Sequence, residues 1–483
     1  MKRYGPYTLW INGAWAAPRS NETLAVIEPA TGAPLAEVAA AGVEDVARAV
    51  DAAHDACPAW ARTPAAQRAR CLERLAARLE ARAAELSVLE ARDSGNPIRN
   101  MRRDVERSIE FLRYFAGLAH ELQGRTVPVE PGVLNYTLRQ PLGVVAGIVP
   151  FNHPLLFACL KLAPALVAGN TFVLKPSEET PLSALELAAL SQDLLPAGVF
   201  NVVTGLGHTA GAALAGHPRV RRISFTGGAA TGREILRLAA KNMVPATLEL
   251  GGKNPNVVLP DVDVETAASV ALAGMNLGVQ GQSCASGTRL LLHGDRHDAV
   301  VEALVKKLKG VRIGPPTDER TEMGTLVSER HLSRVQAWVR RGQADGATLV
   351  VGGSHLRQPE ALAQGCFFEP TVLTDVHSRM ALAQEEVFGP VLAVLRWSEP
   401  EELEQLINDT EYGLTAYVWG RDLKRALGLA ERIQAGYIWV NRPGGHYPGT
   451  PFGGFKHSGL GREGTLASLL SYTEEKNVQV AID

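Results

Sequence analysis

The sequence is poor in cysteine and has little net charge. Only five cysteines occur in 483 residues, and they are scattered and odd in number. This pattern argues against a disulfide framework, and no pair has metal-ligand spacing, so we expect a reducing, cytoplasmic location and no metal site. The net charge of -2 gives no electrostatic reason to expect nucleic acid or an anionic membrane as a partner.

A long unbroken apolar segment is also lacking. The longest apolar stretch, 144–169, is interrupted by Pro150, Asn152 and Lys161 among others, so it predicts no membrane span. The segment 1–13 is positively charged but has no apolar core or cleavage site, which argues against a signal peptide. The composition is 46% hydrophobic and 21% charged, which is ordinary for a globular chain of roughly two to four domains.

Helices are expected in the first part of the chain, and strands that alternate with helices in the rest. Between about 43 and 121, apolar positions recur at helical spacing. From about 144, short apolar runs bounded by Gly, Pro or Asn alternate with helix-like stretches, which predicts two α/β domains with parallel sheets. The strand candidates are VVAGIVP, TFVLKP, VFNVVTG and RRISFTGG and, after residue 250, NPNVVLP, RLLLHG, ATLVVGG and AYVWG.

Two segments fit neither sheet. The segment 124–143 is predicted to form a two-stranded excursion around Pro-Gly, and the C-terminal SYTEEKNVQVAID a polar strand. Exposed strands of this kind are candidates for pairing with another subunit. The alternative is that both are frayed surface hairpins.

Cys284 is the candidate nucleophile among the cysteines. It lies in GVQGQSCASGTR, a polar, glycine-rich run without large apolar neighbours. Such a run is typical of a loop entering a helix, where backbone N–H groups would lower the thiol pKa and bind an oxyanion. The alternative is a buried, inert cysteine, which is the commoner case for a single thiol.

Two polar residues at probable strand ends are further candidates. Glu249, in ATLELGGKNP, would have its pKa raised by burial into the range of a general base. Asn152, in VPFNHPLL, has a side-chain N–H that would suit an oxyanion. The alternatives are a solvated glutamate and an asparagine that satisfies a turn beside Pro154.

The signals for nucleotide binding are weaker. FTGGAATG, from Phe225 to Gly232, places glycines between a strand and a probable helix, where N–H groups would suit a pyrophosphate. TGLGH is a second glycine turn, and either segment would also serve as an ordinary βα turn. Lys175 and Glu178, in LKPSEE, would hold ribose hydroxyls at a strand end or merely begin a helix.

Together and in order, these motifs resemble the aldehyde dehydrogenase family over essentially the whole chain. The matching motifs are PFNHPL, KPSE, FTG-x4-G, LELGGK, GQ-x-C, QEEVFGPV and PFGGFKHSGLGRE. The resemblance implies two doubly wound parallel-sheet domains and a small β oligomerisation flap. It places an NAD-binding domain at 1–122 and 142–249, a catalytic domain at 250–447, and oligomerisation segments at 123–141 and 466–483 of a homodimer or homotetramer.

The resemblance also assigns roles. Cys284 would be the nucleophile, its backbone N–H and Asn152 the oxyanion donors, and Glu249 the base that activates water; Lys161 and Glu463 would serve a proton path. The implied cofactor contacts are Val149, Pro150, Phe151, Lys175, Ser177, Glu178, Gly205, Phe225, Gly227, Gly228, Gly232, Glu386 and Phe388.

The implied reaction converts an aldehyde to a carboxylic acid. A thiohemiacetal on Cys284 would lose hydride to NAD, and the resulting thioester would be hydrolysed. Glu249 argues against release of the acyl group to coenzyme A. Glu178 favours NAD over NADP, without excluding NADP, because a carboxylate bonds the ribose 2′-hydroxyl and repels a 2′-phosphate.

Departures from the family pattern concern the substrate. Phe151, Leu160, Gly278 and His446 stand where many relatives carry larger or aromatic side chains. We therefore expect a wide tunnel and a bulky aromatic or branched aldehyde. The expected substrate contacts are Phe157, Leu160, Gly278, His446 and Tyr447.

Other functions were weighed against this one. A semialdehyde dehydrogenase would need an arginine in the tunnel, for which Arg289 and Arg442 are candidates, although Arg289 is better suited to supporting the loop. A betaine-aldehyde-like aminoaldehyde dehydrogenase is less favoured because a quaternary ammonium needs aromatic faces. A catalytically silent structural or binding protein of the same fold is opposed by the intact set of Cys284, Glu249 and Asn152.

Overall fold

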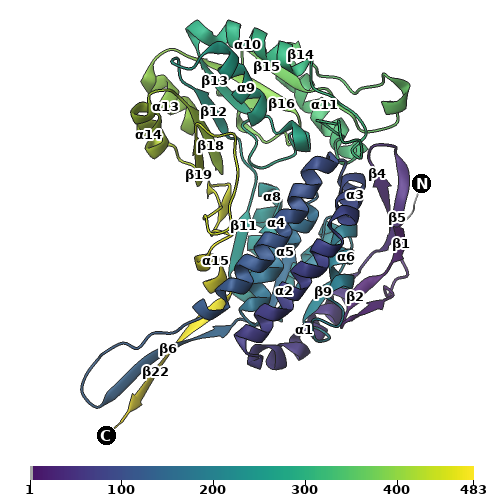
Figure 1. Ribbon diagram of the computed structural model, residues 1–483, viewed down its shortest axis with the longest axis vertical. Helices are drawn as coiled ribbons and strands as arrows, with labels where there is room; N and C mark the ends of the chain where they lie inside the picture. The colour runs from purple at the N-terminus through teal and green to yellow at the C-terminus, as the bar shows by residue number, and fades with distance from the viewer. Residues whose placement is uncertain (1–3, 483) are drawn as a thin grey trace.

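The computed structural model describes residues 4–482 and begins with a small sheet that the sequence did not predict (Figure 1). Its strands are β1 (Tyr4–Tyr7), β5 (Ala33–Ala39) and β4 (Thr23–Glu28). The predicted helical region then follows as α1 (Val43–Arg62), α2 (Ala65–Ala81), α3 (Ala83–Ser94) and α4 (Ile98–Gly117), with a 3-10 turn at Leu118–Glu121. In α4, Met101, Val105, Ile109 and Leu112 recur at helical spacing and are buried, so the apolar periodicity predicted this helix correctly.

The first large sheet has eight strands in the order β21-β11-β10-β7-β8-β9-β2-β3. Its five central strands run parallel: β11 (Ala246–Glu249), β10 (Val220–Thr226), β7 (Val144–Ile148), β8 (Thr171–Lys175) and β9 (Phe200–Val202). The flanking strands are β21 (Gly459–Leu460), β2 (Leu9–Ile11) and β3 (Ala14–Ala16).

Helices cover both faces of this sheet. They include α5 (Pro154–Val167), α6 (Leu182–Ser191), α7 (Ala212–Gly216) and α8 (Ala229–Asn242). Val145 and Phe172 pack with α5 and α6, whereas the neighbouring Val144 and Val173 pack with α1, α7 and α8. Because successive strand residues point to opposite faces, each central strand is buried on both sides.

The second large sheet has seven strands in the order β14-β15-β16-β13-β12-β18-β19. They are β14 (Thr348–Val351), β15 (Thr371–Thr374), β16 (Val391–Trp397), β13 (Arg289–His293), β12 (Pro255–Val258), β18 (Thr415–Trp419) and β19 (Tyr437–Val440). All neighbours are parallel except β14, which pairs antiparallel with β15. The predicted strand ATLVVGG is therefore an antiparallel edge strand, and β15, β16 and β19 were missed.

Helices also cover both faces of the second sheet. One layer is α9 (Val264–Gly274) and α10 (Gly294–Leu308); the other is α11 (Glu329–Ala344), α12 (Ala381–Gln384), α13 (Pro400–Asn408) and α14 (Leu423–Arg432). The fold is thus α/β with two doubly wound, mainly parallel sheets, as the sequence predicted.

The chain returns from the second sheet to the first after β19. This segment, 441–465, contains β20 (Phe455–Lys456), which pairs with β17 (Tyr412–Gly413), and β21, which pairs antiparallel with β11. The short helix α15 (Leu466–Leu470) follows. The return places the C-terminal segment against the end of β11, where Glu249 lies opposite Gly459.

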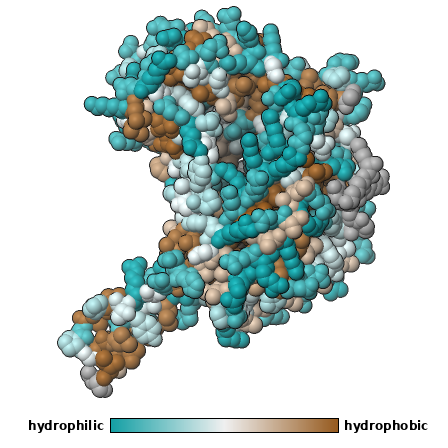
Figure 2. Space-filling view, in the orientation of Figure 1, coloured by the Kyte–Doolittle hydropathy of each residue, from teal (hydrophilic) through white to brown (hydrophobic). Residues whose placement is uncertain are grey.

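A two-stranded ribbon projects from the body of the molecule (Figure 1). It consists of β6 (Val133–Pro141) and β22 (Thr473–Ala481), paired antiparallel along their whole length. The expected hairpin within 124–143 is present only as a short pairing: the Val127 N–H donates to the Asn135 carbonyl oxygen at 2.9 Å and the Thr137 N–H to that of Arg125 at 2.8 Å, around an antiparallel bridge between Thr126 and Tyr136. The long partner of β6 is the C-terminal strand, which the sequence did not predict. Apolar side chains are exposed on this ribbon, as Figure 2 shows, including Leu134, Leu138 and Val480.

The described residues contain no disulfide and no membrane-spanning helix. All five cysteines, which lie between residues 57 and 366, are free thiols. Within 4–482 no helix is both long enough and apolar enough to span a membrane.

A close backbone approach joins the returning segment to the second sheet. A Cβ on Gly436, just before β19, would lie 1.7 Å from the carbonyl oxygen of Gly453. We expect Gly436→Ala to destabilise the protein by about 1–3 kcal/mol, because the added methyl group forces the two backbones apart. Gly428→Ala is the matched control: it lies in α14, where the only atom within 4 Å is an Arg432 nitrogen at 3.8 Å. The melting temperature should decrease for Gly436→Ala alone, and an equal decrease for both variants would contradict the close approach.

Candidate active site

The structure brings the three candidate residues Asn152, Glu249 and Cys284 together from distant parts of the chain. Asn152 follows β7 and precedes α5, and Glu249 ends β11. Cys284 lies in a turn between the 3-10 helix Leu277–Val279 and β13. The expectation of a loop entering a helix is wrong, because this loop leads into a strand. All three line one small cavity.

Two cavities meet at Cys284 and Glu249. The smaller, of about 150 Å³, is also lined by Asn152, Phe388 and others on the predicted cofactor side. The larger, of about 560 Å³, is lined by predicted substrate contacts and by Glu463. Cys284, Glu249, Thr226 and Phe157 line both. One thiol and one carboxylate are therefore accessible from both sides.

Hydrogen bonds hold Asn152 beside the cysteine turn. Its side-chain Nδ2 donates to the carbonyl oxygen of Gln282 at 2.9 Å, and its backbone carbonyl oxygen accepts from Asn96 Nδ2 at 2.9 Å. Because an amide NH2 has two hydrogens, one remains for a ligand. Because Gln282 lies two residues before Cys284, this fixed donor suits an oxyanion that develops next to the thiol.

The Cys284 turn is also held by an asparagine. Asn254 Nδ2 donates to the carbonyl oxygens of Cys284, at 2.7 Å, and Ser286, at 2.9 Å. Burial raises the pKa of the Cys284 thiol, and Glu386 and Glu249 raise it further, while the backbone N–H groups of Cys284 and Ala285 lower it. The sequence predicted a lowered pKa; here burial outweighs the backbone N–H groups. The thiol therefore requires a base.

Glu249 has the properties of that base. It is 4% exposed, and neither carboxylate oxygen has a hydrogen-bond partner among the described residues. Burial raises its pKa well above the ordinary value, Glu463 raises it further, and Lys161 and Arg462 act in the opposite direction. A carboxylate with a raised pKa and free lone pairs can take a proton from the thiol or from water.

Lys161 and Glu463 form a buried ion pair behind Glu249. Lys161 Nζ, from α5, lies 2.6 Å from Glu463 Oε1, and both groups contact Ser224 Oγ of β10 at 3.2 Å. Lys161 is fully buried and Glu463 nearly so. These residues connect Glu249 to the C-terminal segment electrostatically.

Six predicted cofactor contacts line the smaller cavity beside Cys284: Pro150, Phe151, Gly227, Gly228, Glu386 and Phe388. Phe388 has φ +59°, and its ring meets that of Phe151 edge-on at 5.6 Å. Glu386 accepts a hydrogen bond from the Gly252 N–H at 3.1 Å, and burial raises its pKa to about 7.

The local backbone leaves room at this cavity. A Cβ on Gly227 would lie 2.4 Å from the Phe225 ring, and one on Gly251 would lie 2.1 Å from Glu386 Oε2. Gly228 is the N-cap of α8, so free N–H groups of that helix begin next to the cavity. A polar, ring-bearing ligand such as a nicotinamide nucleotide fits this combination of glycines, aromatic rings and a carboxylate.

Seven other predicted cofactor contacts line neither cavity: Val149, Lys175, Ser177, Glu178, Gly205, Phe225 and Gly232. Lys175 Nζ and Glu178 Oε2 lie 3.0 Å apart at the end of β8. Burial lowers the pKa of Lys175; at Glu178, burial is outweighed by Lys175, so that pKa is lowered as well. Phe225 is 3% exposed and belongs to the core under the sheet.

All five predicted substrate contacts line the larger cavity: Phe157, Leu160, Gly278, His446 and Tyr447. The glycine at 278 leaves less space than expected, because a Cβ there would lie 2.5 Å from Asn100 Nδ2 of α4. His446 packs against Phe111 and Phe452, and burial lowers its pKa to about 4. The imidazole is therefore neutral near pH 7.

Several residues that line the two cavities were not predicted from the sequence. Arg103, Asp104 and Arg107 reach the larger cavity from α4, together with His153. Their helical spacing beside the buried Met101 and Val105 was visible, but not the cavity that they face. His331 lines the smaller cavity, and burial lowers its pKa to about 4.

The two arginines considered for the tunnel lie elsewhere. Arg289 is fully buried and donates to the carbonyl oxygens of Lys253, Leu406 and Ile407 at 2.7 to 2.8 Å. It supports the structure around β13, as the sequence suggested. Arg442 donates to the Gly444 carbonyl oxygen at 3.0 Å and to the Tyr447 hydroxyl, and it lines neither cavity.

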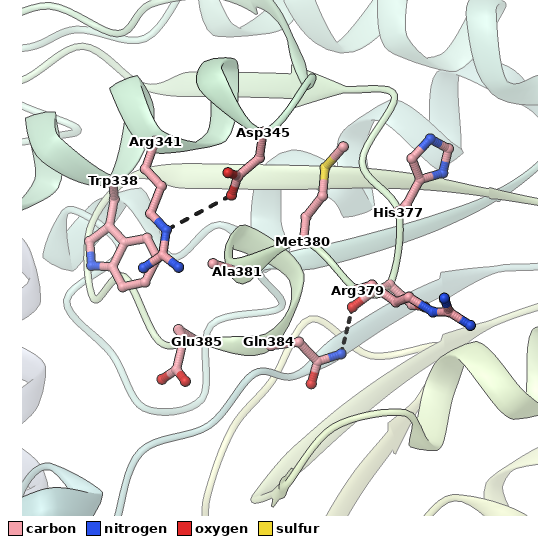
Figure 3. A pocket seen from close by; sticks show the side chains of 10 residues that line it. Trp338, Arg341, Asp345, His377, Arg379, Met380, Ala381, Gln384 and Glu385 are labelled. Carbon is pink, nitrogen blue, oxygen red and sulfur yellow. Dashed lines mark hydrogen bonds and ion pairs between the residues drawn. The ribbon is translucent and has the colours of Figure 1, made fainter.

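An open hollow of about 970 Å³ lies on the surface near α11 and α12 (Figure 3). Trp338, Arg341 and Met380 are among the residues that line it, and Arg341 lies over the Trp338 ring at 5.2 Å. It contains none of the predicted site residues. Among the side chains of residues 4–482, no cluster of three or more His, Cys, Asp or Glu is placed to hold a metal ion.

The fold places one thiol and one carboxylate where two cavities of an α/β protein meet. Comparison with known proteins gives the family: the model of the aldehyde dehydrogenase family matches residues 15–478. The chain is 45% identical to hydroxyisobutyraldehyde dehydrogenase of Mycolicibacterium austroafricanum over 479 residues, which cover 99% of this chain and 94% of that protein.

Solved structures agree with this result. Betaine aldehyde dehydrogenase from Staphylococcus aureus, in complex with NAD+, superposes with a TM-score of 0.96 at 34% identity, covering 99% of this chain and 95% of that one. PnpE from Pseudomonas sp. WBC-3 superposes with a TM-score of 0.95 at 43% identity, covering 99% and 98%. The chain belongs to the aldehyde dehydrogenase family and is an oxidoreductase that acts on aldehydes.

The buried ion pair between Lys161 and Glu463 makes a testable contribution to the stability of the fold. Lys161→Met should destabilise the protein by about 3–5 kcal/mol, because Glu463 is left buried and unpaired beside Glu249. Arg237→Met is the matched control: its ion pair with Glu234, at 2.8 Å, is exposed and should contribute at most about 1 kcal/mol. Urea denaturation measures both changes, and equal changes would contradict the assignment of a buried, mutually dependent pair.

Proposed function

We propose that this protein oxidises an aldehyde to a carboxylic acid with NAD, through a thioester on Cys284. The observation that carries the proposal is that the two cavities meet at Cys284 and Glu249. The solved relatives with NAD+ support the cofactor, and the glycines, rings and carboxylate of the smaller cavity are consistent with it. Bound NAD would supply the hydride acceptor.

The chain's own residues account for the remaining chemistry. Glu249 takes the Cys284 proton, and the thiolate adds to the aldehyde carbon. The Asn152 amide and the Cys284 backbone N–H stabilise the oxyanion, each donor contributing about 2.7–4 kcal/mol to the transition state. When the aldehyde C–H bond breaks as hydride, the carbonyl re-forms as a thioester. Glu249 first releases the proton it took from Cys284 through Lys161 and Glu463, which serve as the proton path. It then deprotonates water, the hydroxide adds to the thioester carbon, the C–S bond breaks to re-form the Cys284 thiolate, and a carboxylate leaves.

Glu178 favours NAD over NADP. Lys175 keeps its carboxylate ionised despite partial burial, since the net shift of the Glu178 pKa is downward. An ionised carboxylate accepts a hydrogen bond from a ribose 2′-hydroxyl and repels a 2′-phosphate. Hydrolysis by Glu249-activated water favours release of the free acid over transfer to coenzyme A.

The preferred aldehyde is bulky, aromatic or branched. The larger cavity, of about 560 Å³, has Tyr417, Trp439 and Phe452 in its lining. The relative named for hydroxyisobutyraldehyde acts on a branched aldehyde by its name. A semialdehyde is the alternative, and an aminoaldehyde is less favoured although the betaine aldehyde dehydrogenase is a structural neighbour.

A homodimer or homotetramer is proposed as well. The β6–β22 ribbon exposes Leu134, Leu138, Val480 and Ile482, which are 39% to 65% accessible. A projecting strand pair with apolar side chains suits pairing with a second copy.

The thioester mechanism predicts a burst. Glu249→Gln should form about one equivalent of NADH per Cys284 in a slowed first phase, because the thiol loses its base, and should then turn over about 10²- to 10⁴-fold more slowly than wild type, because water is not activated either. Cys284→Ala should show neither phase. Cys71→Ala removes a thiol that lines neither cavity and should behave as wild type. Absorbance at 340 nm in a stopped-flow instrument measures the burst; full steady-state turnover by Glu249→Gln would rule out its role.

The size of the larger cavity predicts the substrate preference. Benzaldehyde should exceed acetaldehyde in kcat/KM by at least about 10-fold, because the aromatic lining contributes binding energy that a methyl group does not use. The measurement is the initial rate of NADH formation across an aldehyde series. A preference for acetaldehyde would contradict the wide-tunnel hypothesis.

A further inference from the structure

The lining of the larger cavity is not uniform. Part of it is aromatic, with Tyr417, Trp439 and Phe452. Another part comes from α4 and carries charge, with Arg103 and Arg107 among its residues.

Arg107 is the half-buried cation of this wall. One Nη2 hydrogen bond goes to the carbonyl oxygen of His446, at 2.7 Å. Within the described part of the chain, no carboxylate lies within ion-pair distance of its guanidinium. Because a guanidinium has five N–H donors, most of its hydrogen-bonding capacity is directed to the cavity or to water.

One acid of the α4 wall, Asp104, already has a hydrogen-bond partner. Asp104 is buried, and its Oδ2 lies 2.6 Å from His153 Nδ1. This contact leaves the other ring nitrogen, Nε2, as the free edge of His153, whose ring meets Phe157 edge-on at 5.7 Å. Burial lowers the pKa of His153, but Asp104 outweighs it, and the net shift is upward. When the ring is protonated, Nε2 donates to a cavity ligand.

Two other acids of α4, Glu106 and Glu110, also belong to the lining. Both are exposed to solvent, whereas Arg107 is half-buried. Because exposed charges are screened by water and salt, their effect on a ligand inside the cavity is weaker than that of the Arg107 guanidinium. The other carboxylates of the lining are Glu249, beside Cys284, and Glu463, which is paired with Lys161. The part of the wall around Arg107 thus favours an anion.

We propose that Arg107 determines specificity by binding the carboxylate of an aldehyde that carries a second, acidic group, with His153 as an additional donor. The guanidinium geometry allows two parallel N–H···O bonds to a carboxylate. The substrate class is therefore an aldehyde with a carboxylate tail, with its carbonyl at Cys284 and its tail at α4. This inference rests on the proposed function and deepens it.

The test compares two aldehydes in two variants. In wild type, 4-carboxybenzaldehyde should be preferred to benzaldehyde in kcat/KM, and Arg107→Gln should decrease this ratio about 10- to 100-fold, mainly through KM. Arg107→Lys should keep part of the preference, because the positive charge remains. The rest should be lost, because an ammonium group cannot donate two parallel hydrogen bonds to a carboxylate as the planar guanidinium does. Arg102→Gln is the matched control: it is an exposed arginine of the same helix, paired with Glu319, and should leave the ratio unchanged.

A binding measurement separates this inference from the proposed function. Terephthalate binding to wild type and Arg107→Gln, followed by calorimetry, needs no turnover and should weaken in the variant. If no aldehyde is oxidised but terephthalate binds through Arg107, only the proposed function fails. If the ratio and the binding are unchanged in Arg107→Gln, or if 4-(trimethylammonio)benzaldehyde is the preferred substrate, the carboxylate assignment is overturned.

Discussion

The buried ion pair between Lys161 and Glu463 constrains the arrangement of the whole site. Removing two charges from water is unfavourable unless they are close and hydrogen-bonded. Here the partners are 2.6 Å apart and share Ser224, which comes from a third element. The pair forms only when the C-terminal segment has returned from the second sheet and β21 has joined β11. The closed position of that segment, and with it the enclosure of Glu249, therefore follows from electrostatics as much as from strand pairing.

The same burial tunes the two reacting groups in compatible directions. It raises the pKa of the Cys284 thiol, which makes the thiolate harder to form. It also raises the pKa of Glu249, which makes that carboxylate a stronger base. Because both shifts have one cause, the difference in proton affinity between the two groups is smaller than burial of the thiol alone would produce. Neither Glu249 oxygen has a hydrogen-bond partner in the described structure, so both are free to accept a proton.

Sequence patterns predicted what depends on local order and missed what depends on distant contacts. The helices between 43 and 121 were predicted because their apolar residues repeat with the helical period. Glu249 was recognised as a strand-end carboxylate because apolar residues flank it and Gly-Gly follows it in the sequence. By contrast, the pairing of β6 with β22 joins segments more than 300 residues apart along the chain. The thiol pKa was predicted in the wrong direction because the sequence of the Cys284 turn is polar, while its burial comes from other elements.

The substrate side shows why motifs alone predict chemistry better than specificity. The motifs lie at strand ends, where the backbone must hold a particular geometry, and so they fix Asn152, Glu249 and Cys284. The wall of the larger cavity depends on α4, which none of the motifs covers. Asn100 occupies the space next to Gly278, so a missing side chain in one segment is offset by a side chain from another. His446 is neutral because burial lowers its pKa to about 4, which leaves Arg107 as the half-buried permanent charge near it. Tunnel width and polarity are thus set by pairs of residues from different segments, and a single departure from a motif does not determine either one.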